Sequence, residues 1–116
     1  MIRNYRDLTR LEMEQVDKKE TIILIPLGAL EQHGNQAPLG TDDIIAEAMV
    51  KYIGEELEAI GEKDFPILAF PVIPVGLSTE HKNFCGSITF KPDTYYHILY
   101  DICVSLAHHG FQKIAF

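Results

Sequence analysis

The feature that most constrains the fold is a short, unbroken apolar run, Thr21–Leu27 (TIILIPL), which ends at Pro26 and Gly28. Apolar runs of this length, bounded by turn residues, are typical of parallel strands that helices bury on both faces. The segment therefore predicts a buried parallel strand. A loop rich in Gly, Asn and Pro follows from Gly28 to Gly40.

A long helix is predicted after this loop. Thr41 suits an N-cap position, and the carboxylates of Asp42 and Asp43 suit the positive end of a helix dipole. Gly61 supplies a C-terminal stop. Between these ends, apolar residues recur at helical spacing at Ile45, Met49, Tyr52, Ile53, Leu57 and Ile60.

The rest of the chain repeats this alternation of strand and helix. Pro92 at a first helical position opens a second long helix that Gly110 closes, with apolar residues at Tyr96, Leu99, Cys103 and Leu106. Further strands are predicted at Phe65–Val75, Ser87–Phe90 and Phe111–Phe116, and a short helix at Asn4–Lys19. Strands that alternate with helices predict a single layered α/β domain, 1–116, with a largely parallel sheet.

Composition excludes several classes of function. The 116 residues include 10 basic and 17 acidic ones, and a formal charge of −7 provides no electrostatic footprint for nucleic acid or an anionic membrane. No apolar run approaches the roughly 20 residues that span a bilayer, and Met1–Arg10 lacks the apolar core of a signal peptide, so we expect a cytoplasmic protein. Cys85 and Cys103 are predicted to be reduced thiols, and Cys85 a small packing residue.

Candidate metal ligands follow the first predicted strand. In open α/β sheets the ligand site lies beyond the carboxyl ends of the strands, where Glu31 and His33 stand. In an extended chain their spacing directs both side chains to one side, and the loop before Asp42 can fold back towards them. Such oxygen and nitrogen ligands suit zinc or manganese. From spacing alone, the alternative is that these residues are solvated and that Asp42 only caps a helix.

Longer stretches of sequence carry a resemblance to a known family. IPLGALEQHG is followed by PLGTDD, then by VGLSTEHKNFCGSITF and YDICVSLAHHGFQKIAF, and together they cover most of the chain from Thr21 to Phe116. These stretches resemble the creatininase (creatinine amidohydrolase) family. The resemblance implies that Glu31, His33 and Asp42 are metal ligands, with Asp42 bridging two divalent ions, zinc and/or manganese, and the others binding one each.

The same resemblance implies a reaction. Family members hydrolyse a non-peptide C–N amide bond, cyclic or linear, of a small molecule by means of a metal-activated water, and they are typically homo-oligomers, often hexamers. Creatinine, a formamide-bearing pyrimidine nucleotide intermediate and a short modified peptide are all substrates of relatives. His81, in STEHKNF, is expected in the substrate pocket; the alternative is a loop histidine that hydrogen-bonds to backbone.

Three departures from the family pattern bear on function. Asn35-Gln36-Ala37 stands where many members have a Pro-His pair, which does not favour creatinine as the substrate, and Phe84-Cys85-Gly86 replaces the usual Phe-Pro-Gly. The Asn-Gly-His motif that completes the family's metal site would lie beyond Phe116. We therefore expect the N-terminal portion of a longer, apparently truncated domain. The alternative function is a non-catalytic fragment or oligomerisation module that lacks the downstream ligands.

Overall fold

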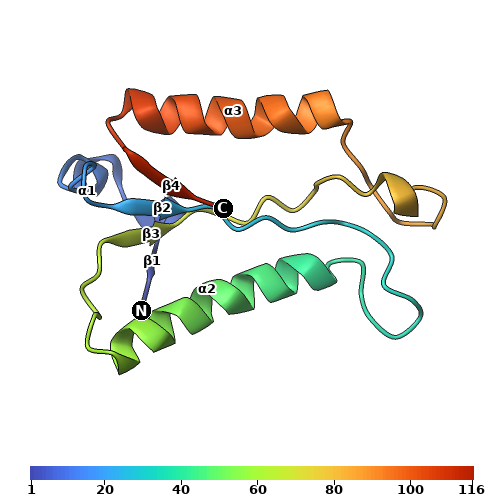
Figure 1. The fold of residues 1–116 in the computed structure, drawn as a ribbon, viewed down its shortest axis with the longest axis horizontal. Helices are drawn as coiled ribbons and strands as arrows, with labels where there is room; N and C mark the ends of the chain where they lie inside the picture. The colour runs from blue at the N-terminus through green and yellow to red at the C-terminus, as the bar shows by residue number, and fades with distance from the viewer.

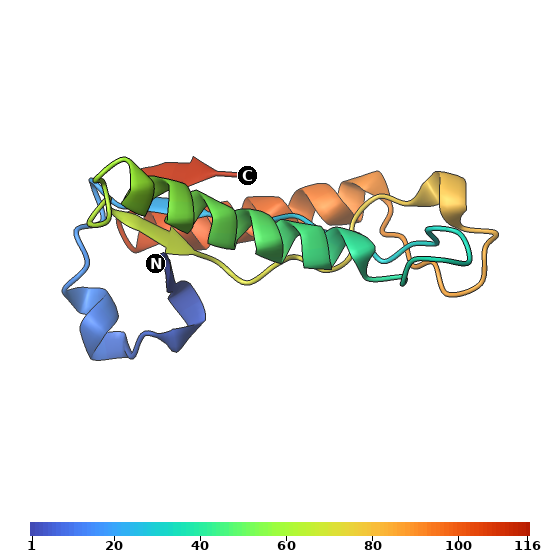
Figure 2. The ribbon, with the colours of Figure 1, turned by 90° about the horizontal axis from the view of Figure 1, so that it is seen from below.

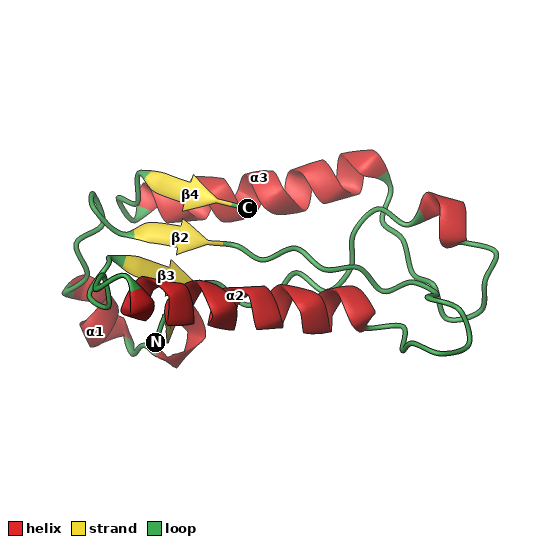
Figure 3. Ribbon diagram, turned by 60° about the horizontal axis from the view of Figure 1, so that its bottom comes forward, coloured by secondary structure: helices red, strands yellow, loops and turns green.

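The computed structural model describes residues 1–116, which form a four-stranded sheet between two long helices (Figure 1). Its strands are β1 (Arg3–Asn4), β2 (Ile22–Leu24), β3 (Ile67–Ala69) and β4 (Lys113–Ala115), in the order β1-β3-β2-β4. Every neighbouring pair is parallel, and the arrows of β2, β3 and β4 point the same way in Figure 3. The predicted layered α/β fold with a parallel sheet is confirmed.

The order of the strands explains why the helices cover opposite faces. Helix α2 (Thr41–Ala59) connects β2 to β3 in one direction along the sheet, and α3 (Pro92–His108) returns the chain past β2 to β4. Right-handed crossovers that run in opposite directions place their helices on opposite faces. Figures 1 and 2 show the sheet lying between α2 and α3. The direction reverses between β2 and β4, and ligand crevices form beyond the carboxyl ends of strands at such a reversal.

The core is built around β2, the strand predicted first. In register, Ile23 lies between Leu68 of β3 and Ile114 of β4. Ile23 and Ile25 have no exposed surface, and with Leu68, Leu106 and Phe111 they form the buried cluster. A strand paired on both edges, with its central residue Ile23 buried and its neighbours Ile22 and Leu24 partly buried, favours apolar residues along its length. The unbroken apolar run therefore predicted this strand correctly.

The ends of the helices differ from the prediction at one point. Gly40, not Thr41, is the N-cap of α2, and Thr41 is the first helical residue. The hydroxyl of Thr41 donates to the carbonyl oxygen of Pro38 at 2.6 Å, so it is turned back to the loop and does not accept from the helix. The predicted stop at Gly61, with φ of +85°, and the start of α3 at Pro92 are confirmed.

The N-terminal segment is not the single short helix predicted for Asn4–Lys19. Asn4 pairs with β3 as part of β1, and a 3-10 helix at Tyr5–Asp7 comes before α1 (Arg10–Glu14). Thr9 separates the two helices because its backbone is extended, as an N-cap requires. The segment projects from one face of the molecule in Figure 2.

All four predicted strands are shorter than expected or missing, and β2 itself covers only Ile22–Leu24 of the segment Thr21–Leu27. Prolines flank β3, which removes donors from the ladder, so only Ile67–Ala69 remains of the segment Phe65–Val75. The last strand is confined to Lys113–Ala115. Ser87–Phe90 does not form a strand, because only Ile88 makes a bridge there, antiparallel to Leu30. That bridge nevertheless joins two loops that carry candidate site residues.

Both long helices expose apolar side chains. On α2 the exposed fractions are 54% for Ile45, 52% for Met49 and 55% for Tyr52, although these residues belong to the apolar pattern that predicts the helix. On α3, Tyr96 and Tyr100 are likewise exposed, and only Leu106 is buried. No helix combines the length and the apolar character that crossing a membrane would require.

Candidate metal site

Two loops at the carboxyl ends of the strands form the frame of the site. The first, residues 28–40, follows β2, and the second, residues 76–91, lies between β3 and α3. The backbone N–H of Ile88 donates to the carbonyl oxygen of Leu30 at 2.8 Å, and the N–H of Gln32 donates to Ser87 Oγ at 3.0 Å. These contacts fix the segment that carries Glu31 and His33 against the second loop.

Glu31, His33 and Asp42 come together at this end of the molecule. His33 Nε2 lies 3.2 Å from Asp42 Oδ2 and 3.9 Å from Glu31 Oε1. One ligand atom from each residue lies within 4.8 Å of the other two. The side chains are 16%, 25% and 33% exposed for Glu31, His33 and Asp42. The structure thus brings together the three residues that the sequence proposes as ligands, at the edge where it proposes them.

The fold of the loop and the first turn of α2 position these side chains. The N–H of Glu31 donates to the carbonyl oxygen of Leu39 at 3.2 Å, which closes the loop back on itself. Asp43, next to Asp42, turns inward: a Cβ added to Gly28 would lie 1.8 Å from Asp43 Oδ1. Gly28 therefore leaves room for the start of α2 to approach β2, with Asp42 directed to the site.

The charged form of Asp43 is destabilised by burial. Its Oδ1 atom is buried and has no hydrogen-bond partner. Burial raises the pKa of Asp43 above its usual value, and the negative charges of Asp42 and Glu47 raise it further, while the backbone N–H of Ala29 opposes this. The two adjacent aspartates therefore differ in role: one faces the candidate ligands and the other packs against the loop.

His81 reaches the same site from the second loop. Its Nε2 atom lies 3.8 Å from Glu31 Oε2, and its Nδ1 atom lies 2.9 Å from Gln32 Nε2. The ring contacts side chains of the site, which differs from the alternative of a histidine bonded to backbone. Glu80 Oε1 is 4.0 Å from the same Nε2 atom, but the Glu80 side chain is 71% exposed. The Glu31 carboxylate therefore lies between two imidazoles.

Two neighbours in the second loop have structural positions. Ser78 is fully buried, and its N–H donates to Thr89 Oγ1 at 2.9 Å inside the loop. Cys85 and Cys103 are both free thiols, as predicted. The expectation that Cys85 is a small packing residue is wrong: Cys85 is exposed, because the turn that carries it lies at the surface beside Phe84, which is 55% exposed.

Gln32, Ser87 and Asp43 support the site in ways that the sequence did not reveal. The contacts of Gln32 and Ser87 depend on the bridge between Leu30 and Ile88, which joins loops far apart in the chain. No periodicity marks that bridge. The one local signal is the polar side chain of Gln32 between two candidate ligands, a position from which neighbouring residues commonly orient metal ligands, and it does not identify a partner.

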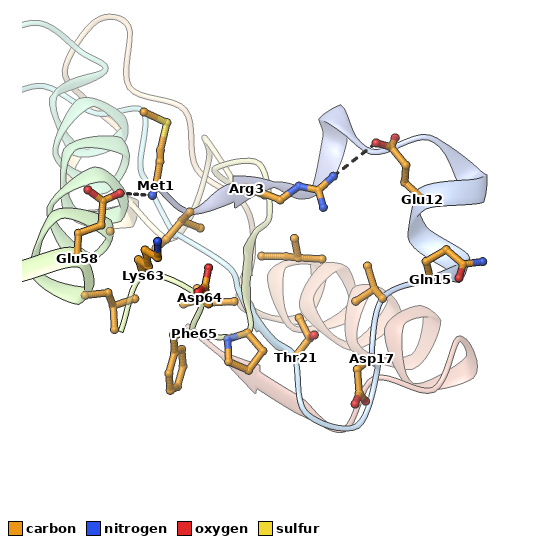
Figure 4. Close-up of a pocket in the computed structure, with 17 residues that line it drawn as sticks. Met1, Arg3, Glu12, Gln15, Asp17, Thr21, Glu58, Lys63, Asp64 and Phe65 are labelled. Carbon is orange, nitrogen blue, oxygen red and sulfur yellow. Dashed lines mark hydrogen bonds and ion pairs between the residues drawn. The ribbon is translucent and has the colours of Figure 1, made fainter. Parts of the chain in front are cut away.

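The largest cavity lies elsewhere. It has a volume of about 910 Å³ and opens at the amino-terminal ends of the strands, beside Thr21 and Pro66, between the N-terminal segment and the last turns of α2 (Figure 4). Arg3 and Glu12 form an ion pair of 3.5 Å across part of its wall. None of the candidate metal ligands lines this cavity. The size of the cavity therefore does not locate the candidate metal site.

Comparison with known proteins agrees with this geometry. The family model described as "Creatinine amidohydrolase" matches residues 6–116, almost the whole chain. The chain belongs to the creatininase family. Among curated relatives, the mycofactocin precursor peptide peptidase of Mycobacterium tuberculosis (strain H37Rv) is 40% identical over 80 residues, which cover 65% of this chain and 31% of that protein. The creatinine amidohydrolase of Pseudomonas putida is 27% identical over 114 residues, which cover 93% of this chain and 41% of the relative.

Solved creatininase structures share the fold. A manganese creatininase aligns with a TM-score of 0.82 and 25% identity, over 98% of this chain and 44% of that one. A mutant creatininase of the Zn-Zn type aligns with a TM-score of 0.81, also at 25% identity, over 98% of this chain and 43% of that one. The chain thus spans less than half the length of these creatininase-family relatives.

Proposed function

We propose that this creatininase-family chain belongs to a metal-dependent hydrolase of amide C–N bonds, in which Glu31, His33 and Asp42 bind divalent metal. The observation that carries the proposal is the convergence of two carboxylates and an imidazole, one ligand atom of each within 4.8 Å of the others. The convergence lies beyond the carboxyl ends of parallel strands, where α/β enzymes bind ligands. Manganese and zinc forms exist among the creatininases that share the fold.

The chemistry of the donor set fits the metal. Imidazole nitrogen together with carboxylate oxygen suits zinc and manganese, and all three side chains are half-buried. Asp42 would hold both of two ions, and Glu31 and His33 would each hold one. Divalent ions bound there would polarise an amide carbonyl and activate a water for attack on it.

The chain's own residues would orient the ligands and the substrate. The hydrogen bonds from Glu31 N–H to Leu39 and from Gln32 N–H to Ser87 hold the ligand-bearing loop in place. Hydrogen bonds of this kind orient the residues that bind the metal directly in metal enzymes. His81, 28% exposed and beside the ring of Phe84, is assigned to the substrate pocket.

Two classes of amide are candidate substrates. A small-molecule amide, cyclic or linear, is supported by the match to the creatinine amidohydrolase of Pseudomonas putida. A peptide amide is supported by the 40% identity to the mycofactocin precursor peptide peptidase of Mycobacterium tuberculosis. Hydrolysis assays of creatinine, a linear formamide and a short peptide with the same preparation would separate these classes.

Metal binding tests the proposal directly. Asp42→Asn removes a carboxylate oxygen from the set, and Asp93→Asn is a matched control because Asp93 lies in the first turn of α3, exposed and outside the converging clusters. Zinc and manganese content after equilibrium dialysis should fall in Asp42→Asn and stay unchanged in Asp93→Asn. Equal metal content in Asp42→Asn and the parent chain would refute the assignment.

Assembly into a homo-oligomer is also proposed. The exposed apolar side chains of α2 and α3 support it, since contiguous exposed apolar surface commonly marks an interface. Sedimentation velocity would test it, and a single monomeric species at all protein concentrations would contradict it.

A further inference from the structure

We propose that Gln32 fixes the tautomer of the His81 ring, with the proton of the neutral form on Nε2, so that His81 serves the site as a hydrogen-bond donor and not as a metal ligand. Two clusters of side chains share Glu31: one contains His33 and Asp42, and the other contains Glu80 and His81. By ligand type alone, either cluster would suit a cation. The hydrogen bonds of Gln32 distinguish them.

The orientation of the Gln32 amide is fixed by the backbone. Gly34 N–H donates to Gln32 Oε1 at 2.9 Å, and a backbone N–H can only donate. The carboxamide oxygen therefore faces Gly34, and the amide NH₂ group faces the other way. The main chain of Gln32 is held independently, because its own N–H donates to Ser87 Oγ. This side chain has no freedom to exchange its oxygen and nitrogen.

The fixed amide determines the tautomer of His81. Gln32 Nε2 lies 2.9 Å from His81 Nδ1, and an amide nitrogen offers only donors. Nδ1 must therefore accept, which requires its lone pair, and the single proton of the neutral ring lies on Nε2. That proton occupies the position through which Nε2 would bind a metal ion, 3.8 Å from Glu31 Oε2.

This arrangement is the opposite of the one that metal-binding histidines show. A ligating imidazole donates its second N–H to a carboxylate or carbonyl oxygen, which leaves the other nitrogen free for the metal. His81 instead accepts at Nδ1, so Glu80 and His81 do not form a second cation site. Its Nε2 atom lies 3.8 Å from Glu31 Oε2 and 4.0 Å from Glu80 Oε1, beyond direct hydrogen-bond distance, so the Nε2–H can donate to a substrate oxygen placed beside Glu31. That role rests on the proposed function, whereas the tautomer does not.

The backbone conformation of Gly34 helps to fix the orientation of the Gln32 amide. Gly34 has a φ of +74°, in the left-handed region that glycine adopts without steric cost. This conformation presents the Gly34 N–H to Gln32 Oε1. Gln32 is thus a positioning residue whose effect passes from the loop backbone to the ring of His81.

The test reads the tautomer in the metal-free 116-residue chain. Two-bond ¹⁵N–¹H correlation spectra of ¹⁵N-histidine-labelled chain, recorded at about pH 8 where a free histidine is neutral, report which nitrogen carries the proton. His81→Gln identifies the signals by their loss, and the exposed His97, His108 and His109 serve as internal references. A proton on Nε2 of His81 supports the proposal. A proton on Nδ1, or an average of both tautomers, overturns it.

A charge variant tests the cause. Gln32→Glu replaces the donor that faces Nδ1 with an acceptor, so the His81 proton should move to Nδ1 and the Nε2 lone pair should become available. Gln36→Glu is the matched control, since it adds the same charge to an exposed position of the same loop. Gln32→Leu should give a mixture of tautomers. If the proton stays on Nε2 in both Gln32 variants, Gln32 does not set the tautomer and the proposal fails.

Zinc uptake completes the test. Gln32→Glu should bind an additional zinc ion per chain by equilibrium dialysis, and the double variant with His81→Gln should lose it, while Gln36→Glu should match the parent chain. If Gln32→Glu carries the proton on Nδ1 but takes up no further zinc, Gln32 is not what excludes a cation from His81. Because the spectra are recorded without metal, they give their answer even if the site proposed above binds none.

Discussion

The two ends of the sheet differ in how their charged residues are satisfied. At the amino-terminal ends, beside the largest cavity, the charges lie at the surface and pair locally, as Arg3 does with Glu12. At the carboxyl ends, Glu31, His33 and Asp42 are half-buried, and their ligand atoms converge. The charges at the first end are solvated and paired with each other. The converging ligand atoms at the second end are arranged so that a cation could bind between them. In this molecule, convergence of half-buried ligands distinguishes the candidate site, and cavity volume does not.

The core that supports both ends should give the largest effect. Ile23 is completely buried in β2, so Ile23→Ala should lower the free energy of unfolding by about 2 to 5 kcal/mol through lost burial and a residual cavity. Ile88→Ala is the control near the site: Ile88 is 50% exposed, and we expect a loss of only about 0.5 kcal/mol. Urea unfolding measures both. Similar losses in the two variants would mean that the loops carry as much of the stability as the sheet.

Metal should stabilise the fold, and this gain should depend only on residues at the carboxyl ends of the strands. At a free zinc concentration of about 100 times Kd, binding to the folded state alone should raise the free energy of unfolding by about 2.7 kcal/mol. Removal of the zinc by a chelator should reverse the gain, and Asp42→Asn should abolish it. Glu12→Gln, at the opposite end, should retain the full gain. Thermal unfolding with and without zinc measures these differences, and a gain that persists in Asp42→Asn would place the metal elsewhere.

Gly34 and Gly61 have similar positive φ angles at opposite ends of the sheet, so substitutions there allow the two ends to be compared. Gly34 and Gly61 have φ of +74° and +85°, and alanine at either should cost about 1 to 2 kcal/mol of stability because Cβ disfavours this region. Only Gly34 presents its N–H to Gln32 in the site; Gly61 ends α2 at the far end of the sheet. Gly34→Ala should therefore weaken zinc binding as well, and Gly61→Ala should not. Isothermal titration of both variants with zinc decides whether the effect on the site is local.

The sequence predicted the central parts of the structure better than the connections. The apolar run at Thr21–Leu27 predicted β2, and glycine and proline predicted where α2 ends and where α3 begins, because these signals are local. Strand ends and spacing made the convergence of Glu31, His33 and Asp42 possible but left solvated loop residues as the alternative, and the family resemblance favoured the ligand set that the structure brings together. The bridge from Leu30 to Ile88 and the contact from Gln32 to His81 depend on loops that meet only in three dimensions, so no local pattern revealed them.

The smallest effect should come from the capping box at the amino-terminal end. Thr9 Oγ1 accepts from the N–H of Glu12, and the Glu12 carboxylate accepts from the N–H and hydroxyl of Thr9 at 2.8 Å each. Thr9→Ala should cost about 0.5 to 1 kcal/mol, since α1 is short and exposed. Zinc affinity should not change. A change in zinc affinity in Thr9→Ala would show that the two ends are coupled through the sheet.

The same capping box should give a small acid-side dependence of stability. Hydrogen bonds from the backbone and then the hydroxyl of Thr9, followed by the charge of Arg3, hold the pKa of Glu12 below its ordinary value of 4.5. A carboxylate whose pKa is lower in the folded state stabilises the fold above its unfolded pKa and loses that contribution as the pH falls through the folded value. The difference in unfolding free energy between the parent chain and Glu12→Gln should therefore be largest near neutral pH and shrink below about pH 4.5. A difference that grows on acidification would mean that the charged form of Glu12 is disfavoured by folding, and the amino-terminal end would then resemble the site more than its exposed pairs indicate.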